Sequence, residues 1–289
     1  MLIGIYHINM KYIIYAGGDH KTAEYCDRVG GSVVLYELGK RLQKKGHDVY
    51  MLCNKSIGDL PSIDERDVER LKNESWIIYP ESIWGNPMNV KNVIRWILFT
   101  PNFYGNTSTW NESDLKYKFC EYFTSDEFLC EPGYLRINEY KLDIFENKNL
   151  GNRNIDCHLI RKFVGRYPIY HKMDSKSLDG NVYSMQELAD IFNNTNIFIC
   201  YDNATYYSIM AALCGATSVI IPDNNINMTR EEFMHKFPIF KYGVAYGMDD
   251  IEWANSTKHL VKDYLLELDK ESDKWLDMFI ENTTKKFRI

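Results

Sequence analysis

Alternating hydrophobic and polar patterns divide the first part of the chain into short predicted elements. Residues 11–15 form a β-rich run, and after Gly30-Gly31 the apolar residues recur at helical spacing from about 33 to 45. A second strand-like run follows at 48–53. Strand, helix and strand in this order predict a βαβ unit, and such units build parallel sheets.

The same pattern continues to about residue 130. We expect a third strand at 76–79, a helix at 90–99 that ends before Pro101, and a further strand at 116–123. A polar stretch at 131–154 then interrupts the pattern. We interpret this stretch as the boundary between two domains.

A second α/β pattern fills the rest of the chain. We expect strands at 157–160, 197–201 and 218–221. The predicted helices are at 184–192, 205–214, 251–268 and 274–286. Ser184 and Glu187 have the spacing of a capping box at the start of the first of these helices. The predicted fold class is therefore α/β, with two Rossmann-like domains that face each other across a cleft. We expect the domains to span residues 1–140 and 141–250, followed by terminal helices at 251–289.

Composition and charge narrow the class of protein. The 289 residues are 45% hydrophobic, which is enough for two cores and is typical of a soluble globular protein. The net charge of −6 argues against nucleic acid as a partner. The apolar runs are much shorter than the ~20 residues of a membrane-spanning helix. Seven scattered cysteines without a CxxC pair favour a reducing compartment, so we expect a cytoplasmic protein.

The sequence lacks the glycine motifs of two common classes of nucleotide-binding protein. No G-x-G-x-x-G fingerprint is present, which disfavours NAD, and no P-loop is present, which disfavours kinase or ATPase chemistry. Open parallel sheets bind ligands at the carboxyl ends of their strands. The candidate ligand-binding residues are therefore those that directly follow the predicted strands.

Two segments of the second domain satisfy this condition. Arg161-Lys162 follow the strand at 157–160, and residues 201–205 lie between a strand and a helix. Unpaired backbone N–H groups at that helix start, together with Asn203 and Thr205, can hold a diphosphate, and the two cations can stabilise it as a leaving group. The same cations are also typical of a solvated strand end, and residues such as Asp202 or Asn203 often cap a helix.

At this point the chain resembles the GT-B class of nucleotide-sugar glycosyltransferases, in particular those that build bacterial polysaccharides. The resemblance covers nearly the whole chain and rests on segments 30–50, 80–98, 200–222 and 242–250. Segment 80–98, which begins Pro-Glu-Ser-Ile-Trp-Gly-Asn-Pro, is similar to a "PE…GNP…VVRWLL" stretch of that class. The combination and order of the segments are specific for the class, although no single segment is.

The resemblance implies how the two domains would work. The first domain would present a glycan or glycolipid acceptor, the second would hold the nucleotide-sugar donor, and the terminal helices would pack back on the first domain. No other cofactor is implied, and a membrane-associated acceptor would allow peripheral membrane association. The nucleobase, the sugar and the oligomeric state are not implied. The implied donor-site residues are Gly30, Gly31, Arg161, Lys162, Tyr201, Asp202, Asn203, Thr205 and Ser208.

One position departs from the pattern of the class. Retaining members commonly carry two glutamates eight residues apart, and these positions fall on Asp202 and Met210 here. Only the first is acidic, so recognition of the ribose would need another residue, and Ser208 is one option; Ser208 is also consistent with a buried helix residue. The departure supports an alternative, a catalytically degenerate GT-B-like protein that binds a nucleotide or a glycan. A sugar epimerase would require glycines or carboxylates that the sequence does not place.

The catalytic base is the least specific assignment. Asp19 and His20 follow the first strand, and Glu81 follows the third, so each is a candidate to take the proton of the acceptor hydroxyl. Each is equally consistent with a turn or capping residue. We expect no metal site, because no DxD-like pair lies at a strand end and Asp249-Asp250 fit the start of a helix better.

Overall fold

The chain folds into two compact units, each built around its own parallel sheet. A computed structural model describes residues 9–16, 30–53, 59–124, 132–149, 151–161, 169–181, 183–203, 205–223 and 226–287. Unit 1 consists of Met1–Glu139 and Lys270–Ile289, and unit 2 consists of Tyr140–Asp269. The predicted α/β class, with a parallel sheet in each of two units, is confirmed.

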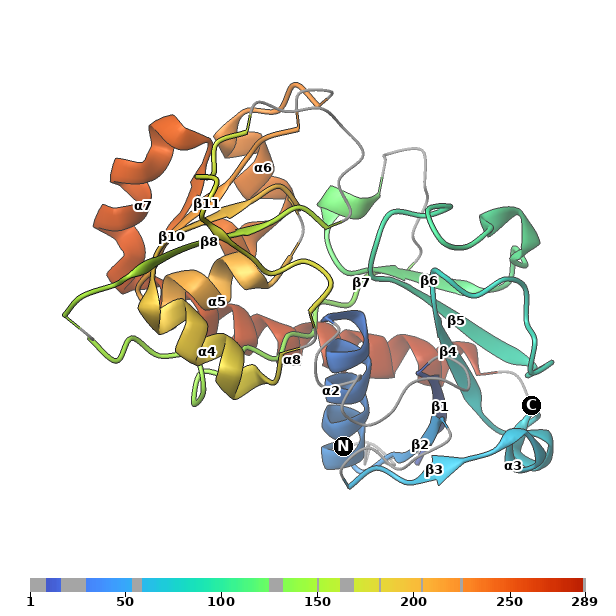
Figure 1. Ribbon diagram of the computed structural model, residues 1–289. Helices are drawn as coiled ribbons and strands as arrows, with labels where there is room; N and C mark the ends of the chain where they lie inside the picture. Colours follow the sequence, from blue (N-terminus) through green and yellow to red (C-terminus); the bar gives the residue numbers. More distant parts are fainter. Residues whose placement is uncertain are drawn as a thin grey trace, which may run out of the picture. The chain divides into compact units, whose positions relative to one another are not determined.

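Unit 1 contains a seven-stranded sheet in the order β3-β2-β1-β4-β5-β6-β7 (Figure 1). All neighbouring strands are parallel. The strands are β1 (Lys11–Tyr15), β2 (Asp48–Leu52), β3 (Ser62–Ile63), β4 (Trp76–Pro80), β5 (Asn92–Ile97), β6 (Leu115–Lys118) and β7 (Pro132–Tyr134). The described α-helices of this unit are α2 (Gly30–Lys44), α3 (Glu65–Leu71) and the second part of α8 (Val261–Lys286).

Side chains of unit 1 alternate between the two faces of its sheet, as a pleated strand requires. On one face, the ring of Phe279 from α8 packs 5.8 Å from the ring of Tyr12 on β1 and 5.0 Å from that of Tyr117 on β6. On the other face, Ile13 belongs to an apolar cluster that includes Val68 of α3. Unit 1 therefore has a core on each side of the sheet.

The predicted helix at 90–99 is wrong, because residues 92–97 form the strand β5. Every side chain of β5 is buried. A strand that is covered on both faces has no polar alternation, so its apolar run cannot be distinguished from a buried helix by periodicity alone. The predicted strands at 11–15, 48–53 and 76–79 are confirmed as β1, β2 and β4.

Unit 2 contains a five-stranded parallel sheet in the order β12-β11-β10-β8-β9. Its strands are β8 (Ile155–Leu159), β9 (Lys176–Ser177), β10 (Thr195–Cys200), β11 (Thr217–Ile220) and β12 (Val244–Tyr246). Its helices are α4 (Met185–Asn194), α5 (Tyr207–Leu213), α6 (Arg230–Lys236) and α7 (Ile251–Thr257). The capping box of Ser184 and Glu187 is confirmed at the start of α4.

The segment 251–289 is divided between the units. Helix α7 packs on β11 and β12 of unit 2, and α8 continues from residue 269 of unit 2 into residue 270 of unit 1. Short 3-10 helices occur at Thr107–Thr109, Glu121–Phe123, Pro238–Phe240, Met248–Asp250 and Lys258–Leu260.

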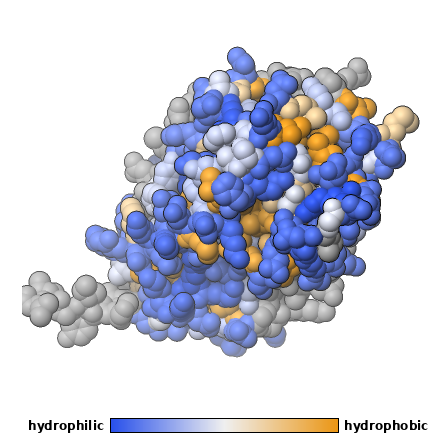
Figure 2. Space-filling view, turned by 90° about the vertical axis from the view of Figure 1, so that its left-hand side faces the viewer, coloured by the Kyte–Doolittle hydropathy of each residue, from blue (hydrophilic) through white to orange (hydrophobic). Residues whose placement is uncertain are grey.

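The strand order fixes where each sheet can bind a ligand. In unit 1 the direction of the chain across the sheet reverses between β1 and β4, and in unit 2 it reverses between β8 and β10. Such switch points open a crevice at the carboxyl ends of the two strands. The face of the molecule in Figure 2 is largely hydrophilic, with hydrophobic residues scattered over it. None of the helices that the structure describes is both long and apolar enough to cross a bilayer.

Candidate functional site

The candidate site of unit 2 lies at the carboxyl ends of β8 and β10. Arg161 follows β8, and its Nε lies 4.0 Å from Oδ2 of Asp202, which follows β10. The Arg161 side chain is 47% exposed, whereas that of Asp202 is 4% exposed. The carboxylate of Asp179 accepts hydrogen bonds from the backbone N–H groups of Ile160 (2.9 Å) and Arg161 (2.7 Å). These contacts hold a solvent-accessible guanidinium at the switch point.

A second set of contacts fixes the segment that begins at residue 169 against the end of β10. The Tyr201 hydroxyl accepts hydrogen bonds from the N–H groups of Tyr170 (2.8 Å) and His171 (3.3 Å) and lies 3.0 Å from His171 Nδ1. His171 stacks on His158, with ring centroids 3.8 Å apart. His158 Nδ1 in turn lies 3.0 Å from the Ser175 hydroxyl. Because Tyr201 accepts from two N–H groups, its own proton is available to His171.

Burial lowers the pKa values of both histidines, and the neighbouring His171 lowers that of His158 further. Both rings are therefore predominantly neutral at pH 7. They add no positive charge next to Arg161, so Arg161 is the main cation that the described residues contribute here. The sequence gives no sign of this stacking, because 13 positions separate the two histidines and only the fold brings their rings together.

The loop between β10 and α5 carries the remaining predicted donor-site residues. Asn203 Oδ1 is buried and has no hydrogen-bond partner among the described residues. Thr205 is buried, and its hydroxyl accepts a long hydrogen bond (3.4 Å) from the N–H of Tyr207, the first residue of α5. Helix α5 begins two residues later than predicted. Ser208 lies inside α5, fully buried beside the Cys200 thiol, as the alternative interpretation of this residue expected.

The predicted residues of unit 1 have different surroundings. Gly30 and Gly31 are the first residues of α2, and Glu81 follows β4. Glu81 is buried, and its Oε2 accepts a hydrogen bond of 2.9 Å from the N–H of Leu98. A Cβ on Gly31 would lie 3.8 Å from the Leu98 side chain. Gly31 and Glu81 therefore both lie next to Leu98, the residue that follows β5.

Three of the predicted site residues, Asp19, His20 and Lys162, lie outside the described residues. Arg161, Tyr201, Asp202, Asn203 and Thr205 are brought together at one switch point in unit 2. Glu81, Gly30 and Gly31 belong to unit 1.

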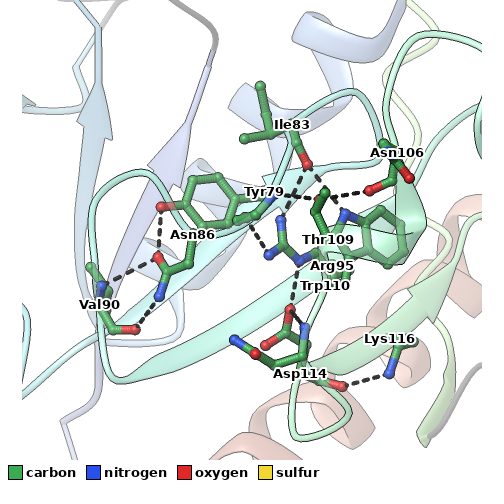
Figure 3. A network of polar contacts seen from close by, with 12 residues as sticks. Tyr79, Ile83, Asn86, Val90, Arg95, Asn106, Thr109, Trp110, Asp114 and Lys116 are labelled. Atoms are coloured by element: carbon green, nitrogen blue, oxygen red, sulfur yellow. Dashed lines mark hydrogen bonds and ion pairs between the residues drawn. The ribbon is translucent and has the colours of Figure 1, made fainter.

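A buried arginine organises the segment of unit 1 that carries the Gly-Asn-Pro motif (Figure 3). Arg95 on β5 is completely buried, and its Nε donates to Asp114 Oδ2 at 2.8 Å. The guanidinium also donates to the carbonyl oxygens of Ile83 (3.4 Å) and Gly85. It lies between two aromatic rings, 4.9 Å from the centroid of Tyr79 and 5.1 Å from that of Trp110.

The motif itself is closed by its own side chains. Asn86 donates to the carbonyl of Val90 (2.8 Å) and accepts from the N–H of Val90 (3.3 Å) and the hydroxyl of Tyr79 (3.1 Å). Asn86 and Arg95 thus fix the backbone of the loop after β4 from two sides (Figure 3). The available sequence signal was an arginine inside an apolar run, a residue type that is rarely buried without a charged partner.

Comparisons with known proteins give little further information. No family model and no curated protein sequence matches the chain. Among solved structures, a crystal structure of MurG from Acinetobacter baumannii is 8% identical, with a TM-score of 0.42, over 96% of this chain and 99% of that one. A likeness this remote assigns no function.

Proposed function

We propose that the chain is a nucleotide-sugar glycosyltransferase that transfers a sugar to a glycan or glycolipid acceptor. The observation that carries the proposal is the placement of Arg161, Asp202 and Asn203 at the switch point between β8 and β10. This is where an open parallel sheet binds a nucleotide. The resemblance of the four sequence segments to the GT-B class supports the same reaction.

The proposed roles follow from the charges of these groups. In the reaction an acceptor oxygen attacks the anomeric carbon, the bond from that carbon to the phosphate oxygen breaks, and the nucleoside diphosphate leaves with an additional negative charge. Arg161 would stabilise that charge, because it is exposed enough to reach a ligand and is held in place by the Asp202 carboxylate. The buried Oδ1 of Asn203 would accept a hydrogen bond from the donor.

The remaining parts of the proposal rest on the sequence. Lys162 would add a second cation, and together with Arg161 it would take the place that a divalent metal occupies in other transferases. Asp19, His20 and Glu81 stay the candidates for the base that accepts the hydroxyl proton. A glycolipid acceptor would bring the protein to a membrane surface, with the reaction on the cytoplasmic side.

Titration of the protein with nucleoside diphosphates and their sugars by calorimetry tests the donor site. We expect one base to bind, and Arg161→Ala to weaken binding by about 10- to 100-fold, since hydrogen bonds to charged groups contribute about 1.5–3 kcal/mol. Lys148→Ala is the control, because Lys148 is a surface cation of the same unit that pairs with Asp190 at 2.7 Å. Equal affinity in the Arg161 variant and the wild type would refute this placement of the phosphates.

A second candidate, a binding protein without catalysis, is favoured by one observation. Met210, at the position where retaining members carry a second glutamate, is a buried apolar side chain of α5. Release of free nucleoside diphosphate from the bound donor distinguishes the two candidates. Slow hydrolysis that depends on Arg161 supports the transferase, whereas tight binding without release for every donor and acceptor offered supports the binding protein.

A further inference from the structure

Unit 1 has a pocket at the amino ends of its strands. This is the edge of the sheet opposite to the carboxyl edge, where parallel sheets usually bind ligands. The pocket has a volume of about 680 Å³. It is lined by Trp76, Asn92 and Leu115, which are the first residues of β4, β5 and β6. The end of α8 and the following Phe287 close another side. We call this cavity the amino-edge pocket.

The lining of the amino-edge pocket has a surplus of positive charge in a chain whose net charge is −6. Four lysines line it: Lys91, Lys116, Lys285 and Lys286. The acidic residues of the lining are Glu112 and Asp114, and Asp114 is neutralised by its buried ion pair with Arg95. Lys285 also pairs with Glu281 on the same helix. An anion would therefore be attracted to this cavity.

Trp76 provides an independent sign of a binding site. Trp76 is one of the lining residues and is 3% exposed, and its buried indole N–H has no hydrogen-bond acceptor among the described residues. Leaving a buried donor without an acceptor destabilises the folded state. The ring of Phe287, another lining residue, lies 6.2 Å from the Trp76 ring. An oxygen of a bound anion is the kind of acceptor that this N–H lacks.

We propose that the amino-edge pocket binds a small phosphorylated ligand with two or more negative charges. Lysines act as point charges that suit phosphate groups, and pockets of about 300–1,000 Å³ suit small molecules. The phosphate groups belong either to a free metabolite or to the headgroup of a phospholipid. The amino-edge pocket shares no residue with the proposed donor site.

Calorimetric titration with pyrophosphate in a buffer of low ionic strength tests the proposal. The background is Arg161→Ala, so that the proposed donor site does not compete for the probe. We expect Lys91→Gln combined with Lys116→Gln to weaken binding at least tenfold. The control combines Lys270→Gln with Lys274→Gln, which removes the same charge from an exposed part of α8 outside the pocket and should leave the affinity unchanged.

A second measurement reports directly on Trp76. Its indole N–H resonance, assigned by its absence from the spectrum of Trp76→Phe, should shift when pyrophosphate is added. Vesicles that contain phosphatidic acid, whose phosphate monoester can carry two negative charges, distinguish the source of the phosphate. Lysine-dependent binding to these vesicles, with no binding to pyrophosphate, assigns the site to a headgroup. Binding of neither probe, or binding that the variant of Lys91 and Lys116 leaves unchanged, overturns the proposal.

Discussion

Replacing Asp114 by asparagine tests whether the ion pair with Arg95 stabilises the loop after β4. The substitution removes one charge from an ion pair that is almost fully excluded from water. The Arg95 and Asp114 side chains are 0% and 2% exposed. Asparagine keeps the size of the side chain and an oxygen that accepts from Arg95. The substitution therefore measures the charge rather than the packing.

The expected magnitude follows from this burial. Two unit charges 4 Å apart attract by about 4 kcal/mol at an effective dielectric constant of about 20. Removing one partner of a buried pair costs about 3–5 kcal/mol, because the other charge stays buried without compensation. Arg95 retains two carbonyl acceptors and two aromatic rings, which places the expected loss near 3 kcal/mol.

Urea denaturation provides the assay, with the midpoint and slope measured for each variant. Asp277→Asn is the matched control, since Asp277 pairs with Lys45 at 2.6 Å but the two side chains are 61% and 38% exposed. We expect that variant to lose less than about 1 kcal/mol of unfolding free energy. In 1 M salt the effect of the control should shrink further, whereas that of Asp114→Asn should persist.

The reasoning is refuted if the losses of unfolding free energy in Asp114→Asn and Asp277→Asn differ by less than about 1 kcal/mol. A double variant, Arg95→Met with Asp114→Leu, adds a further check. Replacing both charges by apolar groups leaves no buried charge uncompensated, so it should be less destabilising than Asp114→Asn alone.

Two further predictions concern unit 2. Gly215→Ala should lower the unfolding free energy by at least about 1 kcal/mol more than Gly180→Ala. Both residues have positive φ (+89° and +69°), which costs alanine about 1–2 kcal/mol at either position. Only at Gly215 would the new methyl group also clash, with the side chains of Arg153 and Asn147. Equal losses in urea denaturation would contradict this. Burial lowers the pKa values of His158 and His171 below the usual 6.5, so the unfolded chain binds their protons first and stability should fall as pH decreases below about 6.5. A variant with both histidines replaced by glutamine should lose less melting temperature between pH 7.5 and pH 5, and an identical pH profile would exclude the pair as a cause.

Local signals in the sequence predicted those parts of the fold that depend on neighbouring residues. The capping box of Ser184 and Glu187 spans three positions, and it forms as predicted. β1 was also predicted from its own short run. In contrast, β5 pairs with β4 on one side and β6 on the other, and a window of its own residues does not contain these neighbours.

The same distinction separates the parts of the candidate site. Arg161 and Asp202 were predicted because each follows a strand, and parallel pairing brings strand ends together. The contact between Tyr201 and His171 joins residues 30 positions apart, and the pair of Arg95 and Asp114 joins residues 19 positions apart. Neither pairing has a local signature, because many arrangements of the intervening chain are compatible with the same sequence pattern.

The interrupted sequence of unit 1 has a consequence for synthesis on the ribosome. Phe279 packs against Tyr12 and Tyr117, and Thr283 is hydrogen-bonded to the Tyr12 hydroxyl at 2.6 Å. These residues are translated after unit 2, all of which precedes residue 270. Domains usually fold in the order in which they are made. Unit 1 therefore completes its core only after unit 2 has been synthesised, so a nascent chain stalled before residue 270 would carry a finished unit 2 and an unfinished unit 1.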